Sequence, residues 1–189
     1  MINPKTASVD VLIVGGGMAG CALAHVLAQK YRVLVLEKQP ETSQQDRVGE
    51  SLPAAALRSL KILGLSDAIN QSANSDYHGV VSIWGQSTPI RKDFFDTLDG
   101  SGLHVDRGSL NRAIKKAAID AGAGFLHDAQ LKSLSSRNGH WAIEVNRLDE
   151  GCQIEARMVV DASGRASVVT RKLGLKRVNA DRAVAIHAQ

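Results

Sequence analysis

The stretch Val11-Leu-Ile-Val-Gly-Gly-Gly-Met-Ala-Gly20 decides the fold of this chain. A short apolar run, typical of a buried parallel strand, leads directly into a turn with the spacing Gly15-x-Gly17-x-x-Gly20. The first glycine permits a tight turn, the second lets a pyrophosphate approach the backbone, and the third lets the following helix pack closely. The pattern predicts a phosphate site at the positive end of a helix over residues 17–29.

An acidic residue follows the glycine turn at the distance that a dinucleotide site requires. Residues 32–36 have the pattern of a second buried strand, which ends at Glu37. In such strand–turn–helix–strand units, an acid about 20 residues beyond the first glycine binds a ribose hydroxyl. We therefore expect an α/β domain with a dinucleotide site. Its expected residues are Gly15, Gly17, Met18, Ala19, Gly20, Glu37 and Lys38.

The composition is that of an ordinary globular protein, with 44% hydrophobic and 22% charged residues and a formal net charge of +4. Its basic residues occur only in short pairs, which favours solvated surfaces over a nucleic-acid patch. Cys21 and Cys152 form no C-x-x-C motif, so neither a metal site nor a disulfide framework is expected. Because the N-terminus lacks a signal-peptide pattern and residues 11–28 contain four glycines, we expect a cytoplasmic protein without a membrane span.

The middle of the chain departs from the alternation of strands and helices. Residues 79–84 and 89–95 have strand patterns and predict a separate antiparallel sheet. The aromatic side chains of Trp84, Phe94 and Phe95 could line a substrate face or pack in a core. Residues 129–134, 140–147 and 152–160 predict a β-meander, with Asn138-Gly139 as a hairpin turn. Helices are expected over residues 54–63, 109–121 and 166–173, and one further strand over 181–188.

The segment Arg47-Val-Gly-Glu-Ser-Leu-Pro53 has two interpretations. Ser51 and Pro53 could simply cap and begin the helix that follows, with Arg47 on the surface. Alternatively, the segment is a second clamp on the cofactor, with Arg47 on a phosphate group.

Taken together, these motifs resemble a known family. The first stretch with Glu37 resembles the FAD-binding start of flavoprotein monooxygenases of the para-hydroxybenzoate hydroxylase type. The segment 47–53 is similar to the arginine and glycine-glutamate segment of flavin-dependent halogenases. Val105-Asp-Arg107 is similar to the segment whose arginine approaches the flavin, and residues 160–167 are similar to the second cofactor motif of this class.

The resemblance implies FAD as the cofactor and assigns residues to it. Arg47 and Arg107 would flank the pyrophosphate and ribityl chain, and Leu131 would meet the adenine through its backbone. It also implies an FAD-binding domain split between residues 1–75 and 101–176, with a substrate-domain sheet beginning in 76–100 and 177–189. No third family motif follows Asp161, so we expect the N-terminal part of a longer enzyme. The further implied site residues are Gly49, Glu50, Ser51, Asp161 and Gly164.

The subgroup is suggested by the departures from the family pattern. Ser163 stands where many hydroxylases carry an aspartate, and the absence of a lysine between Lys61 and Lys92 disfavours a halogenase. Gly-Glu-Ser-Leu-Pro, Ser82-Ile-Trp-Gly85 and His104-Val-Asp-Arg107 look most like flavoprotein maturases of quinone-cofactor amine oxidases.

That likeness implies hydroxylation of a tryptophan in a precursor amine oxidase, with NAD(P)H or another electron donor. The alternatives are a hydroxylase of small aromatic substrates, a reductase of isoprenoid double bonds, or a cofactor- or partner-binding module without turnover. No catalytic residue is assigned, because His78, His104 and His127 are candidates only by residue type.

Overall fold

A six-stranded mixed sheet forms the main body of the protein. The computed structural model describes residues 6–42, 49–85, 87–94, 100–148, 150–176 and 178. Four strands of the sheet are parallel, and the last of these also forms an antiparallel meander with the remaining two, which confirms the expected α/β fold. In the order of the sheet, the strands are β8 (Gly124–Leu126), β2 (Val33–Leu36), β1 (Thr6–Val14), β11 (Glu150–Asp161), β10 (His140–Arg147) and β9 (Ala129–Arg137).

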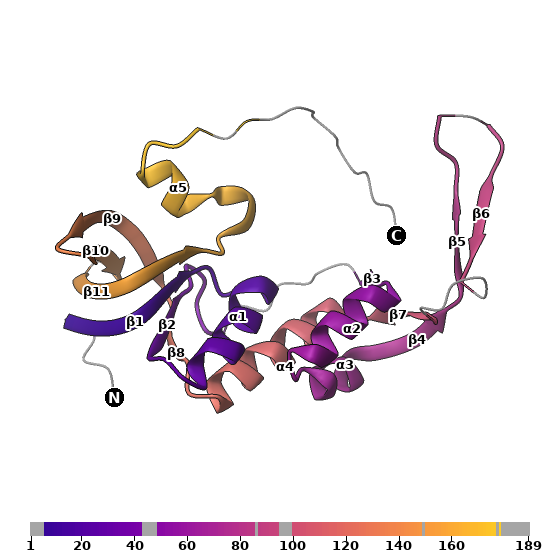
Figure 1. Ribbon diagram of the computed structural model, residues 1–189, viewed down its shortest axis with the longest axis horizontal. Helices are drawn as coiled ribbons and strands as arrows, with labels where there is room; N and C mark the ends of the chain where they lie inside the picture. The colour runs from indigo at the N-terminus through magenta and orange to yellow at the C-terminus, as the bar shows by residue number, and fades with distance from the viewer. Residues whose placement is uncertain are drawn as a thin grey trace.

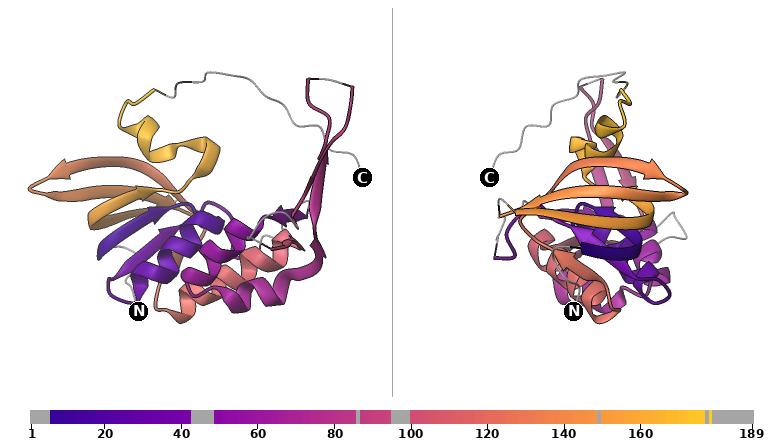
Figure 2. Two further views of the ribbon diagram at one scale, coloured as in Figure 1. Left: turned by 45° about the vertical axis from the view of Figure 1, so that its right-hand side comes forward. Right: turned by 90° about the vertical axis from the view of Figure 1, so that its left-hand side faces the viewer.

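Both faces of the parallel strands are buried, which explains their uninterrupted apolar sequences. On one face, Ile13 and Val35 pack with Ala24 of α1 (Met18–Ala28) and Ala118 of α4 (Arg107–Asp120). The other face packs against the meander in a core of Leu12, Val14, Leu34, Leu36, Ile143, Val145 and Ile154. Figure 2 shows the resulting order of layers, in which the meander, the parallel sheet and the helices lie one on another.

A second, smaller sheet extends from the helical side. Its strand order is β3 (Glu50–Leu52), β7 (Gly102–Val105) and β4 (Ala73–Tyr77). Leu52 and Val105 lie on the face that packs against α4, α2 (Ala54–Ile62) and α3 (Ser66–Ser72). Beyond it, β5 (Gly79–Ser82) and β6 (Ile90–Asp93) form a two-stranded ribbon that projects from the body (Figure 1).

The ribbon carries apolar side chains that are open to solvent. Val81 is 60% exposed, Ile83 63% and Trp84 88%. We expected Trp84 either to pack in a core or to line a substrate face. Its exposure shows that the expectation of core packing was wrong. Phe94 lies 5.5 Å from Tyr77 between ring centroids, while Phe95 lies outside the described residues.

Several local expectations were confirmed and others were wrong. Asn138 and Gly139 both have positive φ, as the expected hairpin requires. Ser51 does not cap α2, because it lies in β3 and the helix begins after Pro53. The helix expected over residues 166–173 is instead a 3₁₀ turn, Gly164–Ala166, followed by α5 (Val168–Lys172), since Ser167 at φ 45° interrupts it. The strand expected over 181–188 lies outside the described residues.

Candidate cofactor site

The glycine turn has the close contacts that its spacing predicts. Gly15 has φ +111°, and a Cβ there would lie 2.4 Å from the carbonyl oxygen of Ala162. A Cβ on Gly20 would lie 2.0 Å from the carbonyl oxygen of Gly15, so the helix could not pack this closely with any side chain at that position. Gly15 and Gly20 are therefore required by the fold itself.

Gly17 differs from the other two glycines because a Cβ there would meet no atom within 4 Å. It is the N-cap of α1, and no side chain caps that helix or places an acid in its first turn. The first N–H groups of a helix have no partner within the helix, and together they attract anions. The open side of Gly17, Met18 and Ala19 thus fits a diphosphate that approaches the backbone directly.

Glu37 is held in place by two backbone N–H groups. Gly16 donates to Oε2 over 2.8 Å, and Gln39 donates to Oε1 over 2.9 Å. A carboxylate has about four acceptor sites, so the two oxygens retain capacity for further hydroxyl donors. Glu37 therefore lies beside the glycine turn with capacity for further hydrogen-bond donors, while the next residue, Lys38, is exposed.

Pairing of β3 with β7 brings Glu50 to the start of α4. Glu50 pairs with Val105, and its Oε2 lies 3.3 Å from Nε of Arg107, the first residue of that helix. Nε of Arg107 is nevertheless a buried atom without a hydrogen-bond partner among the described residues. One helical turn later, Oδ1 of Asn111 is also buried and has no hydrogen-bond partner among the described residues. Buried polar atoms usually have partners, so this face of α4 fits a polar ligand group.

Asn111 is a residue that the motif analysis missed. The available signal is its position, because residues four apart share one face of a helix and Asn111 follows Arg107 at that spacing. On the other side of Glu50, Gly49 is exposed, and a Cβ there would lie 3.5 Å from the Val105 carbonyl oxygen. Arg47, expected on a phosphate, lies outside the described residues.

Asp161 organises the turn that follows β11. Its carboxylate accepts hydrogen bonds from the N–H and Oγ of Ser163 at 3.1 and 2.5 Å, and from the N–H groups of Val169 and Thr170 at 3.0 and 3.1 Å. Burial by itself raises the pKa of Asp161, but these hydrogen bonds outweigh it, so the pKa lies below its ordinary value. The turn lies against Gly15, and Gly164 within it has φ +63° with open space around its α-carbon.

A polar and aromatic cluster lies on the face of the small sheet opposite its core. Ser51 and His104 are directly paired across β3 and β7, and Ser51 Oγ lies 2.8 Å from His104 Nδ1. The rings of His104 and Tyr77 are 4.8 Å apart between centroids. Tyr77 lies over Gly102, where a Cβ would come within 2.3 Å of the ring. His104 is thus contacted from two sides, by Ser51 at Nδ1 and by the ring of Tyr77.

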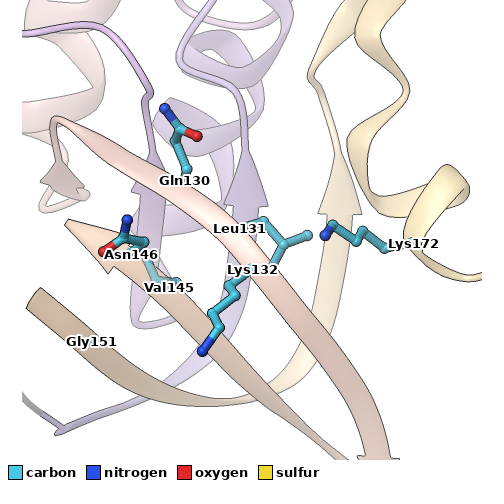
Figure 3. Close-up of a pocket in the computed structure, with 7 residues that line it drawn as sticks. All are labelled: Gln130, Leu131, Lys132, Val145, Asn146, Gly151 and Lys172. Atoms are coloured by element: carbon cyan, nitrogen blue, oxygen red, sulfur yellow. The ribbon is translucent and has the colours of Figure 1, made fainter. Parts of the chain in front are cut away.

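Leu131, expected at the adenine, lies in β9 with its side chain buried in the meander core. It also lines a hollow of about 540 Å³ between the meander and α5, toward which Lys172 points (Figure 3). No residue of the glycine turn lines this hollow, so it is separate from the cradle around Gly17. Its other lining residues are Gln130, Lys132, Val145, Asn146 and Gly151.

Within the described ranges, no helix has the length and apolar character to cross a membrane. The same part of the chain contains no group of three or more side chains arranged to hold a metal ion.

Curated relatives resemble nearly the whole of this chain. A chlorinase acting on 1H-pyrrole-2-carbonyl-[peptidyl-carrier protein] from Pseudomonas fluorescens is 29% identical over 88% of the chain. The putative FAD-dependent oxidoreductase LodB from Marinomonas mediterranea is 27% identical over 96%. The chain spans 42% and 50% of these two proteins, about half their length.

Solved structures share the fold. The p-nitrophenol 4-monooxygenase PnpA from Pseudomonas putida matches 91% of the chain, which covers 45% of that structure, with a TM-score of 0.77 and 21% identity. A geranylgeranyl bacteriochlorophyll reductase-like protein from Thermoplasma acidophilum matches 91% of the chain, with a TM-score of 0.76 and 26% identity. The match covers 43% of that structure. The model of the FAD binding domain matches residues 8–188. The chain therefore belongs to the FAD binding domain family, within the superfamily of FAD-dependent monooxygenases and halogenases, and its cofactor is FAD.

Proposed function

We propose that this chain is the FAD-binding part of an FAD-dependent monooxygenase that hydroxylates an electron-rich aromatic ring. The observation that carries the proposal is the cradle formed by the open side of Gly17 and the fixed carboxylate of Glu37. When bound, the flavin supplies the redox chemistry with O₂ that oxygen transfer to a ring requires.

Each part of the cradle has a proposed role in binding. The backbone of Gly15 to Gly20 receives the diphosphate, and Glu37 accepts hydrogen bonds from the adenosine ribose. Arg107, beside Glu50 and Asn111, meets the ribityl chain and offsets the diphosphate charge. The backbone of Leu131 meets the adenine. Asp161 acts through the turn it holds, because its carboxylate is already occupied by donors of this chain.

We assign residues 1–75 and 101–176 to the FAD-binding domain and 76–100 and 177–189 to the beginning of a substrate domain. The projection of the ribbon β5–β6 from the body supports this division (Figure 1). So does the exposure of Val81, Ile83 and Trp84, since apolar side chains grouped in this way are typical of a surface that another segment or protein covers.

For the substrate, we propose a tryptophan of a precursor amine oxidase, hydroxylated in the cytoplasm while the quinone cofactor is built. The similarity to LodB over 96% of the chain supports this choice. Hydroxylation of a free small aromatic compound is the second candidate. It is favoured by the cluster of Ser51, His104 and Tyr77, where a ring could stack and a hydroxyl group could meet His104 Nε2.

The test begins with the flavin spectrum of the purified chain after addition of FAD and removal of free cofactor. We expect bound flavin, and a colourless protein would reject the enzyme proposal for this chain. Oxidation of NADH or NADPH and consumption of O₂ are then measured with small phenols and with a precursor amine oxidase. Binding of the precursor with little turnover of phenols supports maturation. Coupled turnover of phenols without precursor binding supports the second candidate instead.

A further inference from the structure

The link between β8 and β9 is bonded to the loop that carries Glu37. The N–H of Glu37 donates to the carbonyl of Leu126 over 2.9 Å, and the N–H of Ala129 donates to the carbonyl of Glu37 over 3.0 Å. The carbonyl of Gln39 lies 3.4 Å from the N–H of Asp128. Since the N–H of Gln39 holds Oε1 of Glu37, Gln39 orients that carboxylate together with Gly16.

His127 adds a side-chain connection at the centre of this link. Its Nδ1 lies 3.2 Å from the carbonyl oxygen of Gln39, and its Nε2 lies 3.1 Å from Nζ of Lys115 on α4. The imidazole ring stacks on the ring of Phe125, with centroids 6.0 Å apart and planes inclined by 12°. Nζ of Lys115 also lies over the Phe125 ring. The carbonyl of His127 accepts a hydrogen bond from Arg147 Nε over 3.1 Å.

Only one form of the ring makes both side-chain bonds. Lys115 is a donor without acceptor capacity, and the carbonyl of Gln39 is an acceptor, so His127 must be neutral with its proton on Nδ1. We infer that His127 is a positioning residue for the adenosine half of FAD, and that Lys115 selects its tautomer. In this proposal, Lys115 selects the tautomer of His127, and His127 holds the carbonyl of Gln39. The N–H of Gln39 in turn orients the carboxylate of Glu37. The inference rests on the proposed contact of Glu37 with the ribose.

The arrangement makes cofactor binding dependent on pH. A second proton on His127 would place an N–H group of the charged ring against the Lys115 ammonium, which breaks the chain of bonds. Other charged residues occur near this link. Arg147 on β10 donates to the backbone carbonyl of His127, Asp128 follows it in sequence, and Glu37 and Lys38 precede Gln39 on the neighbouring loop. Binding of the cofactor should therefore weaken when the ring takes up this second proton.

The test measures dissociation constants for FAD, and for ADP as a probe of the adenosine half, between pH 8 and pH 5.5. For the wild-type chain we expect FAD binding to weaken about five-fold over this range, as for the loss of one hydrogen bond. His127→Phe keeps a flat ring on Phe125 but makes neither bond, so both ligands should bind about five-fold more weakly at pH 8. His127→Asn retains a donor for Gln39 and should bind tightly with no dependence on pH.

Lys115→Met removes the opposing charge, so its FAD binding should no longer depend on pH. The control is Lys116→Met, because Lys116 bonds to Asp120 on the exposed surface of α4 and should preserve the wild-type profile. A flat wild-type profile, unchanged FAD binding by His127→Phe, or a loss for FAD without one for ADP would each overturn the inference.

If His127→Phe does not fold, the pH profiles of FAD binding still test the inference. They are measured for the wild-type chain, His127→Asn, Lys115→Met and Lys116→Met. These measurements do not depend on turnover. A chain that shows the expected profiles but hydroxylates nothing would reject the proposed function and leave the role of His127 standing.

Discussion

The backbone N–H of Gly16 donates to Oε2 of Glu37 over 2.8 Å, across the gap between the glycine turn and the end of β2. This bond joins the two parts of the dinucleotide motif through atoms of the chain itself. It holds the carboxylate beside the N-terminus of α1, so the groups proposed to bind the ribose and the diphosphate are adjacent.

The first prediction concerns the charge of that carboxylate. Glu37→Gln replaces one acceptor oxygen with an NH₂ group, so one of the two backbone N–H groups loses its acceptor. We expect FAD to bind about tenfold more weakly, which corresponds to about 1.4 kcal/mol. Titration of the chain with FAD measures this, and Glu155→Gln, at an exposed position of β11, is the control. Equal losses in both variants would contradict the assignment.

The second prediction compares two glycines of the same turn. Gly20→Ala places a Cβ 2.0 Å from the backbone oxygen of Gly15, so thermal unfolding should show a loss of about 3 kcal/mol. Gly17 has φ −73° and open space, so Gly17→Ala should change stability by no more than about 1 kcal/mol. Its methyl group would occupy the open space proposed for the diphosphate and should nevertheless weaken FAD binding. Normal binding by a folded Gly17→Ala chain would show that the phosphates lie elsewhere.

The third prediction follows from the lowered pKa of Asp161. Such a carboxylate stabilises the fold above its ordinary pKa of about 4, and this contribution is lost as the pH falls through the lower folded-state value. Asp161→Asn should lower the free energy of unfolding by about 2 kcal/mol at pH 7. The gap from wild type should shrink toward pH 3 in chemical denaturation.

Asp120→Asn, in an exposed pair with Lys116, serves as the control for Asp161 and should cost about 0.5 kcal/mol. An Asp161→Asn deficit that is as large at pH 3 as at pH 7 would show that the carboxylate charge is not its source.

The fourth prediction separates binding from stability at Arg107. Its ion pair with Glu50 is partly exposed, at 41% and 39% for the two side chains, so Arg107→Gln should cost less than about 1 kcal/mol of stability. FAD should bind more weakly and with a smaller dependence on salt, because the variant lacks a cation that we propose offsets the diphosphate charge. Arg112→Gln, exposed on the same helix, is the control. An unchanged salt dependence in Arg107→Gln would remove Arg107 from the site.

The fifth prediction concerns the thiols. Burial raises the pKa of Cys21 to about 11, and its Sγ lies 3.2 Å from the carbonyl oxygen of Gly16. Cys152 is also buried. Native protein at pH 8 should therefore react with a thiol reagent at neither cysteine, while protein unfolded in denaturant should react at both. Rapid reaction of the native chain would show that the glycine turn opens in solution.

Local patterns predicted the regular parts of the fold correctly. The apolar runs of β1 and β2, the glycine turn and the Asn138-Gly139 hairpin are each specified by residues that are neighbours in the chain. Ser51 was misplaced because a serine before a proline is also a good N-cap. Its actual bond is to His104, 53 residues away, and depends on the pairing of β3 with β7.

The candidate site likewise contains residues that local patterns predict and residues that only the tertiary structure reveals. Sequence reasoning proposed Glu37 from its spacing and Arg107 from resemblance, but it proposed neither Asn111 nor a role for His127. Asn111 is distinguished only by an acceptor atom that is buried without a partner among the described residues. His127 is distinguished only by the two groups that its ring nitrogens meet.

The sequence by itself determined a strand, a glycine turn and a helix followed by an acid, because chain geometry and helix polarity act over a few residues. Only the tertiary structure decided which atoms meet around that turn. Gly16 bonds to Glu37, Glu50 reaches Arg107, and His127 lies between Lys115 and the carbonyl of Gln39, 88 residues away in sequence. These contacts depend on the registers of β3 with β7 and of β2 with β8, and on the packing of α4. Such long-range pairings follow from the packing of the whole chain, and no local pattern of residues specifies them.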